Sequence, residues 1–122
     1  MEIGATKAVQ ARLKTTKIEE SKGASLVFCW DTHLTKIKGR NVLFIVNASN
    51  RYTIAMTDIQ PRNWNYYTMY IRRGIYGVMQ EMGYSDEQIG QYFKMSGDTT
   101  VTKTHGRKSV GGINRMVMDA QY

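Results

Sequence analysis

Residues 41–47, Asn-Val-Leu-Phe-Ile-Val-Asn, are the segment that most restricts the fold. β-Branched and aromatic residues favour extended backbone, and the apolar run lies between two asparagines. A strand with one side in solvent would alternate apolar and polar residues, whereas this run is apolar at every position. The segment therefore predicts a central strand in a sheet that is covered on both faces.

The flanking residues predict a neighbouring hairpin strand. Residues 38–40, Lys-Gly-Arg, have the composition of a turn, and residues 48–50 predict a hairpin loop. Residues 51–57 then alternate with a period of two, which is typical of a half-buried strand. This alternation places three side chains on one face: Tyr52, Ile54 and Met56.

Three further strands are predicted elsewhere in the chain. Residues 1–5 and the apolar residues 25–30 each predict a short strand, and the polar residues 31–33 are expected to end the second one. Residues 99–104 predict the last strand. The polar, charged residues 15–23 are expected to be mobile.

Helical periodicity predicts four helices. A short one covers residues 5–13, and a long one begins near Asp58 or Pro61 and ends at Gly83. Ser85 opens another helix with the spacing of a capping box, and residues 113–120 predict a terminal helix. The apolar stripe of the long helix comprises Trp64, Tyr67 or Thr68, Ile71, Ile75, Val78 and Met82. Residues 1–122 are thus expected to form a single α+β domain, with a mostly antiparallel sheet and helices packed on one face.

Composition favours a binding role. The 122 residues contain 17 lysines and arginines against 10 acids, a formal net charge of +7, which favours polyanionic partners. Eight methionines and eight tyrosines suit an adaptable contact surface as well as a core. One cysteine, Cys29, precludes an intramolecular disulfide, and no signal peptide or membrane-spanning run is evident. We expect a cytoplasmic protein.

The most distinctive polar segment is the basic tail, residues 99–118, which contains no carboxylate. Glycines at 106, 111 and 112 let backbone N–H groups turn toward an anion, and fixed cations raise the local potential. We expect any anion site to lie here. The tail contributes Lys103, His105, Arg107, Lys108 and Arg115.

Several chemistries find little support. Two histidines, His33 and His105, and one cysteine lack the close spacing of a zinc motif, so we expect no metal and no cofactor. A thiol in an apolar strand would have a raised pKa and react poorly, so we assign no catalytic residue. No Walker loop, dinucleotide fingerprint, RNA-recognition motif or zinc finger is present.

Short motifs resemble a family of small bacterial proteins that is catalogued only as a domain of unknown function. The resemblance rests on matches at Lys7, Trp30, Asn47, Thr104, Arg107, Gly111 and Asn114. Asp31 stands where that family has a histidine, and Lys108, Ser109, Gly112 and Ile113 also depart from its closing motif. The resemblance implies that Trp30, Asn47, Arg107 and Asn114 share one locus. It implies no activity, and the missing histidine argues against a catalyst.

Three hypotheses remain open. The first is a non-enzymatic protein that binds nucleic acid or a nucleoprotein through its tail cations, with Trp30 or Tyr52 stacking on bases or packing behind the site. The second is a protein–protein inhibitor of a host defence or toxin-type complex, encoded by a mobile element; a homodimer would also be compatible. The third is an enzyme acting on a phosphorylated small molecule, with His105 as acid or base. The candidate binding residues are Trp30, Asn47, Tyr52, Lys103, His105, Arg107, Lys108, Asn114 and Arg115.

Overall fold

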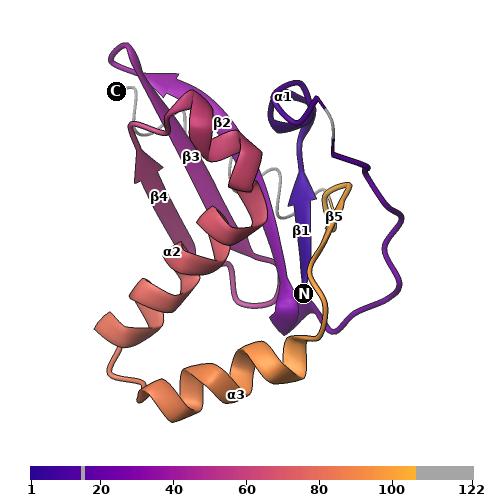
Figure 1. Ribbon diagram of the computed structural model, residues 1–122, viewed down its shortest axis with the longest axis vertical. Coiled ribbons are helices and arrows are strands. Elements are labelled where there is room, and N and C mark those ends of the chain that lie inside the picture. Colours follow the sequence, from indigo (N-terminus) through magenta and orange to yellow (C-terminus); the bar gives the residue numbers. More distant parts are fainter. Residues whose placement is uncertain (15, 107–122) are drawn as a thin grey trace.

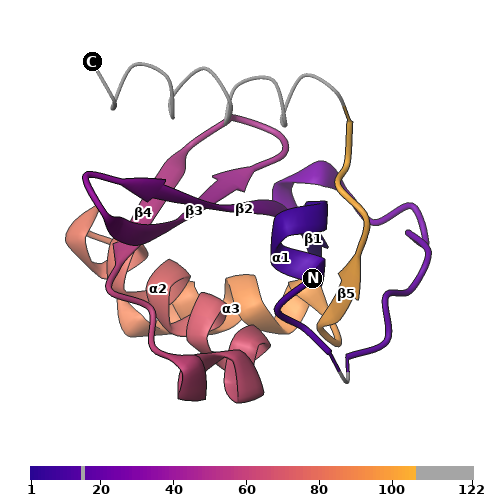
Figure 2. The same ribbon diagram turned by 90° about the horizontal axis from the view of Figure 1, so that it is seen from above.

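The computed structural model describes residues 1–14 and 16–106. Five strands form one sheet in the order β4-β3-β2-β1-β5. Its strands are β1 (Glu2–Ala5), β2 (Cys29–Ile37), β3 (Arg40–Asn47), β4 (Thr53–Thr57) and β5 (Thr100–Thr102). The α-helices are α1 (Lys7–Gln10), α2 (Tyr67–Glu81) and α3 (Asp86–Ser96). Helices α2 and α3 lie together on one side of the sheet (Figures 1 and 2), which confirms the α+β class.

The sheet is mixed rather than purely antiparallel. β3 pairs antiparallel with both β2 and β4, whereas β1 pairs parallel with both β2 and β5. Parallel neighbours need a long crossover, and the chain from α1 to β2 supplies it. Strand β1 therefore lies inside the sheet, between β2 and β5, and the two edge strands are β4 and β5.

β3 is buried on both faces, as its continuous apolarity predicts. Leu43 and Ile45 point to the helix side and join the main core with Ile71 and Ile75. The alternate residues Val42, Phe44 and Val46 form a second buried cluster on the opposite face.

The prediction for the strand over residues 25–30 was wrong at both ends. Residues Leu26–Phe28 form a 3-10 turn, and β2 begins at Cys29 and continues through the polar residues 31–33 to Ile37. These residues remain in the strand because their side chains find partners there. The Thr32 hydroxyl donates to the Gly4 carbonyl at 2.7 Å and also bonds the Tyr67 hydroxyl.

Two other terminal predictions need correction. The first helix covers only Lys7–Gln10, although Val9 and Leu13 are buried as expected, and the last strand is shortened to β5.

The polar segment before β2 is tied to the sheet: Glu19 pairs with Thr102 in a parallel bridge. The predicted helix over residues 113–120 lies outside the described residues.

Helix α2 ends at a motif that glycine makes possible. The N–H groups of Gly83 and Tyr84 donate to the carbonyls of Gln80 and Met79, which is the Schellman pattern. Gly83 has φ +94°, a conformation that side chains disfavour. Ser85 then caps α3 through a capping box, as predicted. The short turn at residues 83–85 sets the angle between α2 and α3.

Gly77→Ala and Gly83→Ala should have opposite effects on stability. A Cβ at either position would meet no atom within 4 Å, but only Gly83 has a positive φ. Gly77→Ala should raise the free energy of unfolding by about 1 kcal/mol through helix propensity. Gly83→Ala should lower it by about 1 kcal/mol through backbone strain. Urea unfolding of both variants checks this, and equal effects would refute the Schellman assignment.

Candidate functional site

The structure has two candidate sites, one on each face of the sheet, and neighbouring residues of β2 contribute to both. Successive side chains of a strand point to opposite faces. Trp30 therefore faces α2 and α3, whereas Asp31 faces the other way. Trp30 is opposite Asn47 in the β2–β3 pairing, so these two residues share the helix-facing side.

On the helix side, a groove of about 440 Å³ opens between the start of β2, the β3–β4 turn and the two long helices. We call it the Met–Tyr groove. Its lining residues are Val27, Phe28, Trp30, Asn47, Asn50, Tyr52, Ile75, Val78, Met79, Met82, Tyr84, Gln88, Gln91, Tyr92 and Met95.

Paired polar groups fix the floor of the groove. Trp30 Nε1–H donates to the Tyr92 hydroxyl at 3.0 Å, and that hydroxyl donates to the Val27 carbonyl at 2.7 Å. Asn47 Nδ2 donates to the same carbonyl at 3.1 Å, and the Phe28 ring packs on Tyr92 at 5.2 Å between centroids. Asn47 Oδ1 also accepts from two backbone N–H groups in the next turn. The floor is therefore held in place before any ligand arrives.

The walls of the groove are apolar and exposed. Met82 and Met95 are 50% and 63% exposed, and Tyr84 and Tyr52 are 49% and 38% exposed. Val27 is 40% exposed at the same site. Large exposed apolar side chains gathered around one hollow are typical of a binding surface.

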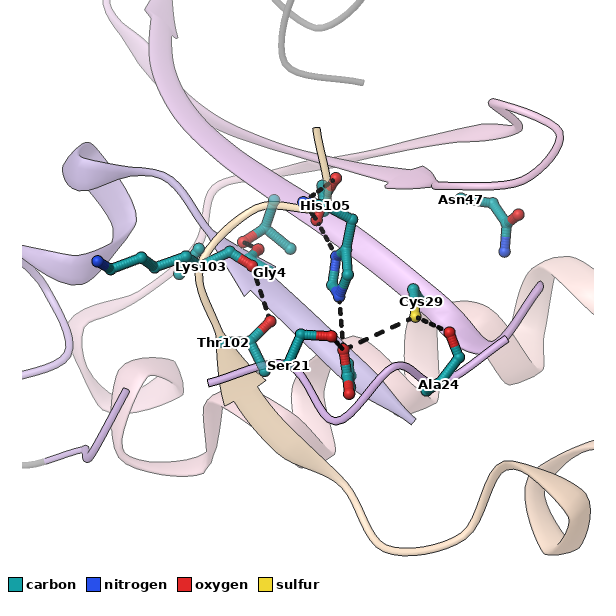
Figure 3. A network of polar contacts seen from close by, with 12 residues as sticks. Gly4, Ser21, Ala24, Cys29, Asn47, Thr102, Lys103 and His105 are labelled. Carbon is teal, nitrogen blue, oxygen red and sulfur yellow. Dashed lines mark hydrogen bonds and ion pairs between the residues drawn. The ribbon is translucent and has the colours of Figure 1, made fainter. Parts of the chain in front are cut away.

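On the opposite face, His105 is held between two buried carboxylates, and Figure 3 shows it on the same side as Ser21 and Cys29. His105 Nδ1 lies 2.6 Å from Asp31 Oδ1, and Nε2 lies 2.8 Å from Glu2 Oε1. The His105 backbone N–H also donates to both Asp31 oxygens at 3.1 Å. The three side chains are only 5%, 6% and 0% exposed for His105, Glu2 and Asp31.

Two carboxylate acceptors favour the imidazolium form of His105. Burial opposes the charge, but the hydrogen bonds to Asp31 and Glu2 outweigh burial and raise the pKa of His105. Burial also opposes ionisation of Glu2. Hydrogen bonds from Ser21, His105 and the Lys22 N–H nevertheless lower the Glu2 pKa to about 2.

Gly4 makes room for Asp31 in this network. A Cβ on Gly4 would lie 2.0 Å from Asp31 Oδ1 and 3.0 Å from Thr104 Cα. Neither contact is tolerable, so the glycine allows the carboxylate and the chain before His105 to approach β1.

Cys29 borders the same network as a neutral thiol. Burial first, and then the nearby Glu2 carboxylate, raise the pKa of Cys29 to about 11. A fully buried thiol with that pKa is not a nucleophile at neutral pH, which agrees with the sequence-based expectation. Glu2, Cys29 and His105 are nevertheless all ligand types for transition metals.

The candidate residues from the sequence fall into two groups. Trp30, Asn47 and Tyr52 line the Met–Tyr groove, whereas His105 belongs to the buried network and Lys103 is exposed close to it in the sequence. The remaining candidates, and with them most of the expected anion site, lie outside the described residues: Arg107, Lys108, Asn114 and Arg115. His33 lies two residues beyond Asp31 on the same face of β2, and its Nδ1 bonds Thr6 Oγ1.

Sequence reasoning missed the role of Glu2. Nothing in Met-Glu-Ile-Gly distinguishes a buried carboxylate from a solvated one, and its partners are 19 and 103 residues away. The groove methionines carried little signal in the sequence, since Met82 belongs to the predicted apolar stripe of the long helix and Met79 lies beside that stripe.

Fold and sites together define a small α+β protein with an apolar groove on one face of a mixed sheet and a buried carboxylate–histidine network on the other. The chain belongs to the family described as a domain of unknown function, DUF6933, whose model matches residues 2–122. This confirms the resemblance seen in the sequence. No curated protein and no solved structure matches the chain. Within the described residues, no helix has the length and apolarity needed to cross a membrane.

The His105 network predicts a loss of stability above pH 6.5. Because the pKa of His105 is higher in the folded than in the unfolded protein, protonation of His105 stabilises the fold. This contribution is fully present below pH 6.5, the pKa of an unfolded histidine, and is lost as the pH rises through the pKa of the folded state. Each unit of elevation corresponds to about 1.4 kcal/mol. Between pH 6.5 and 8.5, the free energy of unfolding of the wild type should fall relative to that of His105→Gln.

Urea unfolding in EDTA-containing buffers at several pH values measures this difference. Burial lowers the pKa of His33 and also that of the Met1 amino group. Both groups therefore change stability with the opposite sign, so the comparison is made as wild type minus His105→Gln. Cys29 ionises in the unfolded chain near pH 9, which sets the upper limit of the window. Parallel pH profiles for the two proteins would refute the imidazolium assignment.

Proposed function

We propose that this protein is a non-enzymatic binding protein whose recognition surface is the Met–Tyr groove. The occupant is the apolar face of a helix in a protein partner with net negative charge. The observation that carries this proposal is the gathering of exposed apolar side chains around one hollow with a fixed floor. Such a surface would suit an inhibitor of a host complex encoded by a mobile element, acting in the cytoplasm, where Cys29 stays reduced.

The shape and flexibility of the groove favour a helix as the occupant. The groove lies between two helices and a sheet end, so side chains projecting from one face of a third helix can enter it together. Methionine side chains on the wall, from α2 and α3, can adjust to those side chains. Trp30 and Tyr92 beneath them do not need to move, because their polar groups are already paired.

The charge of the molecule favours an acidic partner. Every lysine and arginine among the described residues is exposed, whereas the carboxylates of Glu2 and Asp31 are buried. The surface of the described residues is therefore more basic than their count of charged side chains alone indicates. Long-range attraction would speed encounter, and the apolar groove would supply the specific contact.

Substituting groove methionines by aspartate should abolish partner binding. Met82→Asp and Met95→Asp place a charge in the contact and should each weaken binding at least about tenfold, or 1.4 kcal/mol. Met69→Asp is the matched control, because Met69 is also exposed on α2, at 52%, but does not line the groove. Quantitative pull-down from a native lysate, followed by titration of the recovered partner, measures the effect.

Three results decide this proposal. A protein that is retained at high salt by the wild type and Met69→Asp, but lost with both groove variants, supports it. Equal recovery by all four proteins, or no protein recovered, refutes it. Thermal unfolding of each variant ensures that lost binding does not reflect lost folding.

Nucleic-acid binding is a second candidate, favoured by the uniformly exposed cations. In this alternative, Lys103 and the tail residues Arg107 and Lys108 contact phosphates. Trp30 is only 6% exposed, so it would support the site from within and would not stack on bases. Tyr52 retains an exposed ring.

Salt dependence tests this second candidate. Affinity for a fluorescein-labelled single-stranded RNA should fall steeply between 50 and 200 mM salt, because phosphate contacts release counterions. Replacing Lys103, Arg107 and Lys108 by alanine should reduce the slope of log affinity against log salt by about one for each lost contact. Lys38→Ala, at the β2–β3 turn, serves as the control. Affinity that does not change with salt would exclude this candidate.

The described geometry gives less support to an enzyme acting on a phosphorylated molecule. Both ring nitrogens of His105 are engaged by carboxylates, and its side chain is 5% exposed. A general acid or base must reach the proton that it transfers, and this histidine faces the protein interior.

A further inference from the structure

Three side chains of metal-binding type converge on the face of the sheet opposite α2 and α3. Glu2 comes from β1, Cys29 from the first position of β2, and His105 from the segment after β5. Their ligand atoms, a carboxylate oxygen, Sγ and a ring nitrogen, all lie within 4.8 Å of one another. Cys29 and His105 are 27 and 103 positions away from Glu2 in the sequence. Only the parallel placement of β1 between β2 and β5 brings the three residues together.

Asp31 holds His105 in the orientation that a metal ligand needs. Metal-bound histidines usually donate their second ring N–H to a carboxylate, a backbone carbonyl or water, which fixes the tautomer and the ring plane. His105 Nδ1 lies 2.6 Å from Asp31 Oδ1, and its Nε2 points at Glu2, toward the cluster. The backbone N–H of His105 also bonds Asp31, so the same carboxylate positions both the ring and the main chain.

We propose that Glu2, Cys29 and His105 form a binding site for Zn²⁺ or a similar divalent transition metal, with Asp31 as the group that orients His105. The set combines one oxygen, one nitrogen and one sulfur ligand, which suits zinc and disfavours magnesium or calcium. Both histidine and cysteine would bind as their deprotonated forms.

The distances are close to those of a tetrahedral site. Ligand atoms on a tetrahedral zinc are separated by roughly 3.3–3.6 Å, given bond lengths of about 2.0–2.3 Å. His105 Nε2 and Glu2 Oε1 are 2.8 Å apart, and Cys29 Sγ and Glu2 Oε1 are 4.0 Å apart. One of these pairs must open and the other must close by roughly half an ångström, and Cys29 Sγ and the His105 ring nitrogen lie within 4.8 Å of each other. The fourth position would be filled by water or by the Ser21 hydroxyl, which lies 2.7 Å from Glu2 Oε1.

Charge also balances without further groups. In the metal-free cluster, an imidazolium and a neutral thiol accompany two carboxylates, which gives a net charge of −1. When a divalent ion enters, the Nε2 proton and the thiol proton leave to solvent, and the net charge of ion and four side chains is again −1. The ion therefore replaces two protons and leaves no additional buried charge.

Titration of the full-length, EDTA-treated protein with Co²⁺ and Zn²⁺ tests the site. Co²⁺ should bind one to one and give a near-ultraviolet thiolate charge-transfer band. The chain has one cysteine, so this band can arise only from Cys29. Zn²⁺ should displace Co²⁺ and raise the unfolding midpoint by about 5 °C or more, since ligands that bind only the folded state stabilise it.

Variants separate this site from incidental binding. Cys29→Ser should remove the charge-transfer band, and His105→Gln and Glu2→Gln should each weaken Zn²⁺ binding at least about tenfold. His33→Gln is the matched control, because His33 lies on the same face of β2 but bonds Thr6 and is outside the cluster. If His105→Gln fails to fold, Cys29→Ser alone decides, because the serine hydroxyl preserves size.

The proposal is overturned by a folded wild type that shows neither the band nor a Zn²⁺-dependent midpoint. It is also overturned if the band or the midpoint shift survives in Cys29→Ser, or if His33→Gln loses either of them. None of these outcomes depends on partner binding at the Met–Tyr groove, which lies on the other face of the sheet.

Discussion

The pairing of His105 with two buried carboxylates is the interaction on which this structure depends most. Glu2 and Asp31 lie on adjacent parallel strands, and without a cation their burial would be costly. His105 supplies that cation and adds a backbone N–H for Asp31. A buried charge that loses its partner is strongly destabilising, so the chain after β5 must return to this point of the sheet.

The same network connects parts of the chain that share no strand pairing. Ser21 and Lys22 bind Glu2 from the long crossover between α1 and β2, and His105 binds it from beyond β5. The crossover is polar in sequence, yet these contacts fix its course across the sheet. A metal ion at this point would strengthen a connection that already exists and would not create a new one.

The two faces of β2 separate the proposed recognition surface from the buried polar network. Trp30 and Asn47 support the floor of the Met–Tyr groove through the Val27 carbonyl and Tyr92. Asp31, one residue further along, serves the buried network on the opposite face. A rigid sheet therefore lies between the two sites, and the groove can adapt to a partner through its methionines while the network stays in place.

The amino-acid sequence by itself determined the central strand β3, the hairpin to β4, the apolar stripe of α2 and the caps around Gly83 and Ser85. These features depend on local backbone preference and on periodicity, which neighbouring residues carry. It also named Trp30, Asn47 and Tyr52 as candidate binding residues, and the family resemblance implied that Trp30 and Asn47 share one locus. Only the tertiary structure decided that β1 is interior, that β2 continues through three polar residues, and that Glu2, Asp31 and His105 meet. Those outcomes depend on partners between 28 and 103 residues away, because a buried polar side chain is tolerated only when the folded chain supplies its hydrogen bonds.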